Sequence, residues 1–212
     1  MVQVIVVRAD RSARGREVVQ WAKREASLRE LPLQAVHDSS SAVAGEARLV
    51  VTGWSGGVMT DYACPVVFVP MARGHGHAEI ALGMDAHDPA EAAVDFAFDT
   101  ARRWGVRLRA VHAWRFPSRA AELPFGIPEE DRGAWEDQEA QLLSDGLRPW
   151  REKYPQVQVL EDVRLLPPAQ ALVRLSAGAG LVVVGRRPGG GSGAVTRVLV
   201  RESRCPVAVV PA

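Results

Sequence analysis

Residues 205–211 read CPVAVVP, and residues 64–70 read CPVVFVP. Each segment places an uninterrupted apolar run directly after a Cys-Pro pair, which is typical of a strand that is buried on both faces. The same strand pattern therefore occurs twice in the chain, 141 residues apart. A recurrence of this kind indicates an internal repeat, which constrains the fold more strongly than any single segment does.

Three further pairs of segments match in the same order in the two parts of the chain. They are residues 5–10 with 80–85, residues 36–37 with 111–112, and residues 49–53 with 181–185. We therefore predict a tandem duplication, with a truncated unit at residues 1–72, a Gly- and His-rich linker at residues 73–78 and a complete unit at residues 79–212. Relative to the second unit, the first lacks one strand and two helices.

The complete unit alternates apolar strand-like runs with segments of helical periodicity. Its expected strands are residues 80–84, 107–113, 157–163, 181–184 and 206–210, and its helices begin near Pro89, Glu129, Pro167 and Thr196. This alternation predicts an α/β fold in which parallel strands form an open, doubly wound, Rossmann-like sheet.

The truncated unit keeps four expected strands and one expected helix. The strands are residues 4–9, 33–36, 49–52 and 65–69, and the helix is residues 13–29. With a single helix, one face of this sheet would be exposed unless another part of the chain or a partner covers it. The last strand of each unit is a sheet edge, and bare edges tend to pair. We therefore expect residues 65–69 to lie antiparallel to residues 206–210.

The composition argues against several classes of protein. The chain of 212 residues carries 26 basic and 25 acidic residues, and the resulting formal charge of +1 leaves no surplus for binding a nucleic acid backbone. The sequence has no run of about 18 apolar residues and no signal-peptide pattern, so we expect no membrane partner. Its two cysteines, Cys64 and Cys205, are too few for a disulfide framework or a zinc cage. We expect a cytoplasmic protein in which both thiols are buried.

The ordered set of motifs resembles the universal stress protein family over nearly the whole chain. The motifs are a first strand that ends in Asp85, a second strand that reads VHAW at residues 111–114, a fourth strand at residues 181–185 before a Gly-rich loop, and the ending at residues 205–210. The resemblance implies two doubly wound units of the adenine nucleotide alpha hydrolase type, which pair through their last strands. We also expect a homodimer through the exposed sheet face of the truncated unit.

In ATP-binding members of that family, the loop after the fourth strand has the pattern Gly-x2-Gly-x9-Gly-Ser/Thr. Such glycines let backbone N–H groups approach phosphates, and the following helix adds a favourable dipole. Residues 185–194 read GRRPGGGSGA, five residues shorter than that pattern and with Ala194 in place of the hydroxyl residue. The resemblance implies a nucleotide site made of loop residues and of two residues at the adenosine end: Gly185, Arg186, Arg187, Gly189, Gly191, Ser192, Gly193 and Ala194, with Asp85 and Val111.

Two functions stay open on the sequence alone. In the first, the second unit binds an adenine nucleotide, ATP with Mg²⁺ being the implied ligand, and the first unit is a scaffold. In the second, no nucleotide binds and the protein acts through protein–protein contacts. We expect no nucleotide in the first unit, because its loop after Gly53 is shorter still and Arg8 stands where the second unit has Gly83.

A hydrolase is the least favoured function. Residues 53–57 read GWSGG and match the Gly-x-Ser-x-Gly pattern, which would make Ser55 a nucleophile. The unit that contains Ser55 is too small for such an enzyme, and Arg187 stands at the corresponding position of the second unit. We therefore predict no catalytic residues.

The histidines do not predict a metal site either. His75, His77 and His87 could chelate a metal, but they lack the spacing of a known ligand motif. His37 and His112 stand at the same place in the two units, which favours a shared packing or hydrogen-bonding role.

Overall fold

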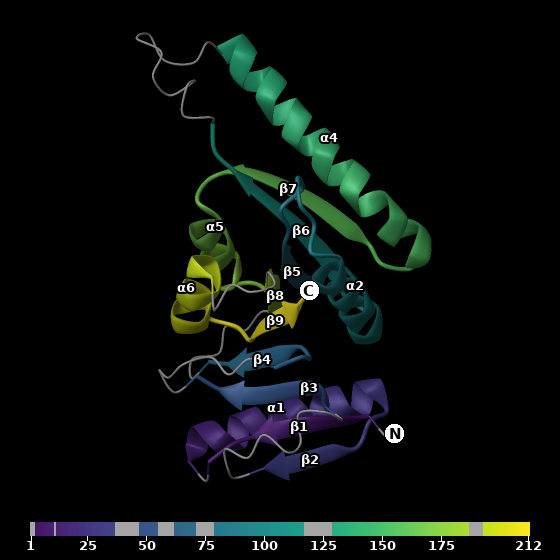
Figure 1. The fold of residues 1–212 in the computed structure, drawn as a ribbon, viewed down its shortest axis with the longest axis vertical. Coiled ribbons are helices and arrows are strands. Elements are labelled where there is room, and N and C mark those ends of the chain that lie inside the picture. Colours follow the sequence, from purple (N-terminus) through teal and green to yellow (C-terminus); the bar gives the residue numbers. More distant parts are fainter. Residues whose placement is uncertain are drawn as a thin grey trace.

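Nine strands of the described chain form one sheet, and helices cover both of its faces (Figure 1). The computed structural model describes residues 3–10, 12–36, 47–54, 62–70, 79–116, 129–186 and 193–212. In chain order the elements are β1 (Val4–Arg8), α1 (Ala13–Arg29), β2 (Leu33–Val36), β3 (Ala47–Gly53), β4 (Val66–Val69), β5 (Glu79–Gly83), α2 (Glu91–Trp104), β6 (Arg107–Trp114), α4 (Glu129–Lys153), β7 (Val159–Leu165), α5 (Pro168–Leu175), β8 (Leu181–Arg186), α6 (Ala194–Glu202) and β9 (Val207–Pro211). The predicted α/β class is confirmed.

Most elements begin and end within a few residues of the predicted bounds. α2 begins at Glu91, two residues after the predicted Pro89, and Ala90 is its N-cap, whose carbonyl accepts from Val94 N (3.1 Å). α2 ends at Trp104 because Gly105 takes a φ of 65°, a left-handed conformation that glycine adopts without strain.

The centre of the sheet is an antiparallel pair of strands, β4 and β9. Their register joins Val66 to Val209, Val67 to Ala208 and Phe68 to Val207, which confirms the predicted antiparallel contact. All other strand pairs in the described residues are parallel. The full order is β2-β1-β3-β4-β9-β8-β5-β6-β7.

The strand order is repeated on the two sides of the β4–β9 pair. Outward from the centre, one side runs β4, β3, β1, β2 and the other runs β9, β8, β5, β6, with β7 added at the second edge. Strands that match in sequence thus occupy matching places in the sheet. This order is the one expected of two units paired through their last strands, and the division of the chain at residues 73–78 remains our proposal.

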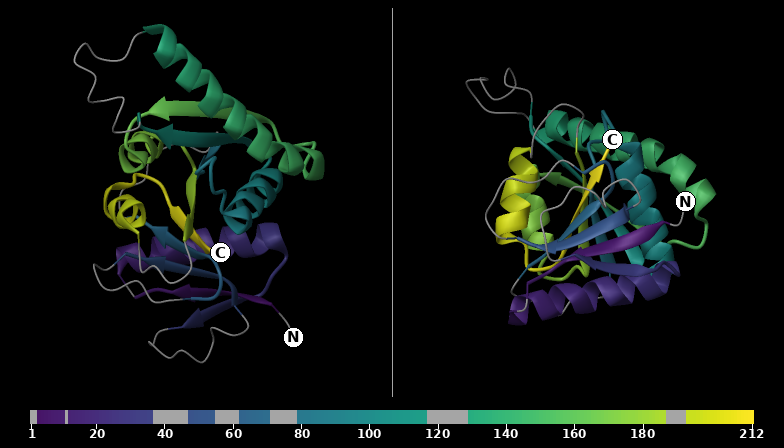
Figure 2. Two further views of the ribbon diagram at one scale, coloured as in Figure 1. Left: turned by 45° about the horizontal axis from the view of Figure 1, so that its top comes forward. Right: turned by 60° about the horizontal axis from the view of Figure 1, so that its bottom comes forward.

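The helices form two layers, one on each face of the sheet. The views in Figures 1 and 2 place α1, α2 and α4 on one face and α5 and α6 on the other. Phe98, Leu143 and Leu147 belong to the core under the first layer, and Leu172 and Leu199 belong to the core under the second. None of the described helices combines the length and the apolar character needed to cross a bilayer.

On the sheet face that points away from α1, four positions of β1, β3 and β4 are buried, where the sequence predicted an exposed face unless another part of the chain or a partner covers it. Val6, Val50, Val66 and Phe68 are at most 7% exposed and belong to the same core as Leu172. These four positions therefore offer no apolar surface for the expected homodimer.

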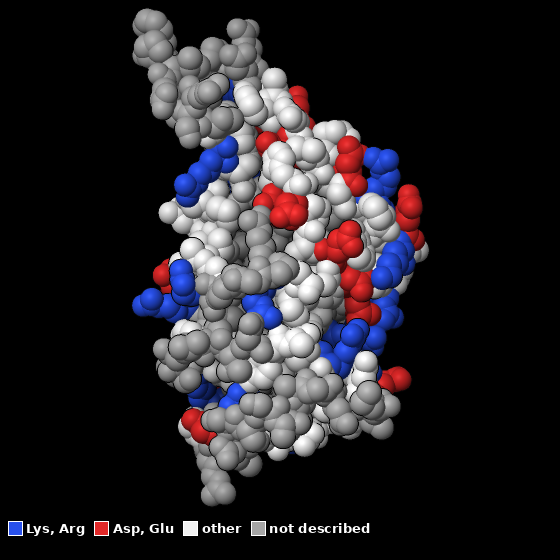
Figure 3. Space-filling view, in the orientation of Figure 1, with Lys and Arg blue, Asp and Glu red and all other residues white. Residues whose placement is uncertain are grey.

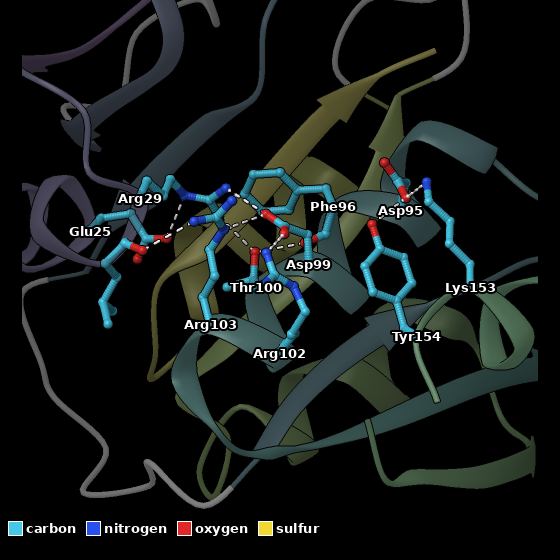
Figure 4. A network of polar contacts seen from close by, with 11 residues as sticks. Glu25, Arg29, Asp95, Phe96, Asp99, Thr100, Arg102, Arg103, Lys153 and Tyr154 are labelled. Atoms are coloured by element: carbon cyan, nitrogen blue, oxygen red, sulfur yellow. Dashed lines mark hydrogen bonds and ion pairs between the residues drawn. The ribbon is translucent and has the colours of Figure 1, made fainter. Parts of the chain in front are cut away.

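A network of ion pairs joins α1 to α2 (Figure 4). Arg29 on α1 donates from Nε to Glu25 of the same helix (2.7 Å). Its other two nitrogens reach α2, where Nη1 donates to Asp99 (3.2 Å) and Nη2 to Thr100 Oγ1 (2.8 Å). Glu25 is 1% exposed and also accepts from the indole N–H of Trp104 (3.1 Å). The network ties the first part of the chain to the second on one face of the sheet.

Candidate functional site

A cavity of about 880 Å³ lies where β5, β6 and β8 end, beside the first turns of α2 and α6. We call it the strand-end cavity. β6 and β8 flank β5 on opposite sides, so the chain turns in opposite directions from β5. In doubly wound sheets this switch point, at the carboxyl ends of the strands, is the usual place for a ligand.

Four of the predicted site residues line this cavity: Asp85, Val111, Gly185 and Arg186. Asp85 follows β5, is exposed, and accepts a hydrogen bond from His87 N (3.2 Å). Val111 on β6 is 2% exposed, and its carbonyl accepts from Met84 N (3.0 Å). The parallel strands bring these residues together because their carboxyl ends meet at one edge of the sheet.

The two residues that end β8 have additional contacts. A Cβ built on Gly185 would stand 2.4 Å from Cβ of Ala90, so the absence of a side chain lets β8 lie directly against the start of α2. Arg186 donates from Nη2 to the carbonyl of Tyr62 (2.7 Å). Arg186 therefore lines the cavity and also contacts the segment just before β4.

The start of α6 provides the other predicted residues that the structure describes. Gly193 is its N-cap and Ala194 its first residue, both exposed, while Val195 and Thr196 line the cavity. No side-chain cap is formed there by a described residue. The first N–H groups of a helix lack intrahelical partners and lie at the positive end of its dipole, which favours an anion. The predicted residues Arg187, Gly189, Gly191 and Ser192 lie outside the described residues.

The corresponding place at the end of β1 has a different structure. Ser12 caps α1 by accepting from Gly15 N (3.1 Å), and a Cβ on Gly15 would stand 1.8 Å from the carbonyl oxygen of Asp10. Arg8 donates to the hydroxyl of Tyr62, and Arg14 donates to the carbonyl of Trp54. Both arginines of this region thus have polar partners, and the absence of a nucleotide site beside Asp10 stays a prediction.

Sequence reasoning missed a side-chain cluster in the wall of the strand-end cavity. His112 Nε2 lies 2.9 Å from Glu139 Oε2, and His87 Nε2 lies 3.0 Å from the same oxygen. His112 thus has a hydrogen-bonding role, and its Nδ1 also accepts from Ala86 N (3.2 Å). The predicted sharing of this role with His37 stays a prediction, because His37 lies outside the described residues. Glu139 stands four residues before Leu143 on the buried stripe of α4. A carboxylate at a position predicted to be buried was the sequence feature that could have identified Glu139.

The remaining candidates divide into buried thiols and undescribed residues. Cys64 and Cys205 are buried, as predicted, and burial raises the pKa of the Cys205 thiol to about 12. Ser55, His37, His75 and His77 lie outside the described residues, so the hydrolase and linker-histidine alternatives stay untested predictions.

The face drawn in Figure 3 shows no segregation of acidic from basic side chains over α2 and α4. Acidic and basic groups are interspersed over α2 and α4, in line with the near-neutral composition. The described residues on this face therefore present no continuous basic surface of the kind that binds a nucleic acid backbone.

Comparison with known proteins finds one matching family model and several curated relatives. The family model described as the universal stress protein family matches residues 78–211. Universal stress protein Rv2005c of Mycobacterium tuberculosis is 36% identical over 191 residues, covering 79% of this chain and 63% of that protein. Universal stress protein Rv2623 of the same organism is 35% identical over 164 residues, covering 73% of this chain and 54% of that protein. The chain thus spans less than two thirds of these relatives.

Solved structures show the same fold at low sequence identity. A universal stress protein from Archaeoglobus fulgidus matches with a TM-score of 0.64 and 13% identity, over 98% of this chain and 96% of that one. A putative universal stress protein from Pseudomonas aeruginosa matches with a TM-score of 0.53 and 16% identity, over 99% of this chain and 82% of that one. From the matched family model and the sequence relatives together, the chain belongs to the universal stress protein family.

Proposed function

We propose that the strand-end cavity binds an adenine nucleotide, with ATP and Mg²⁺ as the form that the family resemblance implies. The observation that carries the proposal is the convergence of Asp85, Val111, Gly185 and Arg186 on one cavity of about 880 Å³. This volume lies within the range of about 300–1,000 Å³ that is usual for small-molecule sites.

The start of α6 would hold the phosphates. Gly193 and Ala194 are exposed and carry no long side chain, so an anion can reach the uncapped N–H groups of the first turn. Arg186 adds a positive charge to the lining of the cavity. The short Gly-rich loop is compatible with this role because the helix start itself supplies the donors.

The end of β5 would hold the adenosine moiety, as the resemblance implies for Asp85 and Val111. The exposed carboxylate of Asp85 can accept hydrogen bonds from ribose hydroxyls. Val111 and Val184 provide a buried apolar wall against which a base can pack.

Calorimetric titration of the purified chain with ATP, with and without Mg²⁺, tests the proposal. We expect saturable binding that Asp85→Asn weakens roughly tenfold through the loss of charged hydrogen bonds. Asp10→Asn, at the matching position of the first part, is the control and should leave the affinity unchanged. Absence of heat and of any thermal shift at millimolar ATP would overturn the proposal and favour a nucleotide-free protein that acts through protein contacts.

A pair of variants at Ala194 tests the phosphate end separately. Ala194→Asp places a carboxylate at the helix start, which suits the helix dipole but repels phosphate, so ATP affinity should fall at least about tenfold while stability holds. Ala194→Ser restores the hydroxyl found in ATP-binding relatives and should strengthen binding. Equal affinity of both variants and the parent would rule out α6 as the phosphate site.

The homodimer expected from the sequence was assigned to the sheet face of the first unit, where Val6 and Val50 are buried, so it needs another surface. β4 and β9 do not provide one. These two strands pair with each other within one chain, and the sheet ends instead at β2 and β7. We propose dimerisation through one of these outer edges, and light scattering on the purified chain tests it: a monomer at every concentration would exclude it.

A further inference from the structure

We propose that His87, His112 and Glu139 bind a divalent cation of the zinc type in the wall of the strand-end cavity. The cation is proposed to bind the chain in the absence of nucleotide, so this proposal does not depend on the function proposed above. The three residues come from three elements: the turn before α2, strand β6 and helix α4.

The ligand atoms already have close to the required spacing. One atom from each residue lies within 4.8 Å of the other two. Glu139 Oε2 lies 2.9 Å from His112 Nε2 and 3.0 Å from His87 Nε2. With bonds of about 2.0–2.2 Å, neighbouring ligand atoms of a tetrahedral zinc site stand about 3.3–3.5 Å apart. To admit the ion, each distance to Glu139 has to grow by a few tenths of an ångström, and the imidazole nitrogens, at most 4.8 Å apart, have to approach each other by no more than about 1.5 Å.

The surroundings of His112 offer a hydrogen-bond partner to Nδ1 in either tautomer. Nδ1 accepts from the backbone N–H of Ala86 (3.2 Å) and lies 3.3 Å from the carbonyl oxygen of Met84. With the proton on Nε2, the ring donates to Glu139 and accepts from Ala86. With the proton on Nδ1, the ring donates to Met84 and turns the lone pair of Nε2 toward the cation, as metal-bound histidines commonly do, and the Ala86 N–H then loses its acceptor.

Burial gives the carboxylate a reason to bind a cation. The side chains of His112 and Glu139 are 3% and 6% exposed, and the ion-pair partners described for Glu139 are the two histidines. A buried carboxylate is costly unless positive charge accompanies it. A divalent ion between the three side chains supplies that charge without requiring a protonated imidazole.

The ligand set also selects the class of ion and leaves room for a ligand. Two imidazoles and one carboxylate suit Zn²⁺, whereas Mg²⁺ prefers oxygen ligands throughout. His87 is 57% exposed at its side chain and lines the cavity with His112 and Glu139. Three protein ligands leave a fourth position of a tetrahedral ion open to the cavity, where water or a ligand oxygen can bind.

No short sequence motif contains this site. His87 and His112 are 25 residues apart, and Glu139 follows 27 residues later. Only the packing of α4 against β6 brings the carboxylate to the imidazoles.

The test is calorimetric titration of the full chain with Zn²⁺ after removal of metals by a chelator, without nucleotide. We expect one Zn²⁺ per chain in the strand-end cavity and no displacement of it by millimolar Mg²⁺. His87→Ala changes an exposed side chain, and Glu139→Gln keeps the shape and the hydrogen-bond acceptor. Each should weaken binding at least about tenfold. Circular dichroism shows whether both variants remain folded.

The linker histidines provide the matched control. The double variant His75→Ala, His77→Ala removes two imidazoles, the same number as the cluster contains, and leaves the three cluster residues unchanged. It should bind Zn²⁺ like the parent chain. The proposal is overturned if the parent shows no saturable Zn²⁺ binding, or if His87→Ala and Glu139→Gln bind as tightly as the parent. Loss of binding in the double variant alone would assign Zn²⁺ to the linker and overturn it as well.

Discussion

Gly185 at the end of β8 and Ala90 at the N-cap of α2 lie so close that a Cβ on Gly185 would stand 2.4 Å from the Cβ of Ala90. The contact joins a strand to a helix start on the wall of the strand-end cavity. It gives Gly185 a structural role in addition to the one expected from the family pattern. It also makes the pair a sensitive point for substitution.

We predict that Gly185→Ala destabilises the chain by about 1–3 kcal/mol, the usual range for overpacking, because the two methyl groups cannot both fit. Urea unfolding measures the change. Ala90→Gly in the same chain should restore most of the loss by removing the opposing Cβ. A Gly185→Ala variant as stable as the parent would contradict the contact.

Arg29→Met should destabilise the chain by about 3 kcal/mol, because it leaves the carboxylate of Glu25 buried without its cation. The matched control is Arg132→Met on α4, whose ion pair with Glu136 is about half exposed. That control should change the free energy of unfolding by no more than about 0.5 kcal/mol. Similar changes in the free energy of unfolding for the two variants would show that the α1–α2 network contributes little to stability.

Val67→Pro should destabilise the chain by about 3 kcal/mol or more, because proline removes a backbone donor from a central strand. Val67 is fully buried. It pairs with Ala208 of β9 on one side and with Val51 of β3 on the other. Val67→Ala shortens the same side chain but keeps the N–H group, so the difference between the two variants reports the lost strand pairing. Thermal unfolding followed by circular dichroism compares them, and equal melting temperatures would refute the central pairing.

Stability should fall in acid partly through Glu79. Burial raises the pKa of Glu79, but hydrogen bonds and charge from Arg109 and Arg107 lower it by more, so its net pKa lies below the ordinary 4.5. A depressed pKa in the folded state stabilises the protein at pH values above the unfolded-state pKa. This stabilisation is lost as the pH falls through the folded-state pKa.

Glu79→Gln removes this contribution, so the variant should be less stable than the parent at pH 7. The gap should narrow between about pH 5 and pH 3, as the parent carboxylate is protonated. Unfolding free energies measured across this range test the sign. A gap that stays constant or widens in acid would show that Glu79 is not held in its ionised form.

The fold was predictable where local pattern and global topology agree. The apolar runs after Cys64 and Cys205 identified the strands that meet at the centre of the sheet. Asp85, Val111 and Gly185 were predicted to share a site from the family resemblance, and they line one cavity because the carboxyl ends of neighbouring parallel strands meet at one edge of the sheet. The strand predictions used periodicity and strand direction, whereas the site prediction used the resemblance.

The rest depended on packing between distant elements. Glu139 reaches His112 only because α4 lies across β6, and Arg29 reaches Asp99 only because α1 and α2 share a face of the sheet. The burial of Val6 and Val50 was missed because the number of helices alone does not determine what covers a sheet face. Such contacts have no signature in periodicity or local spacing.

The β4–β9 pair has a thermodynamic consequence, because both strands belong to one polypeptide. Two separate chains joined by such a contact would come apart on dilution, since their association depends on protein concentration. Covalent linkage replaces that dependence with a fixed effective concentration, set by the segment between the strands. The contact should therefore persist at the lowest cellular abundance, even where a homodimer formed through the outer edges dissociates.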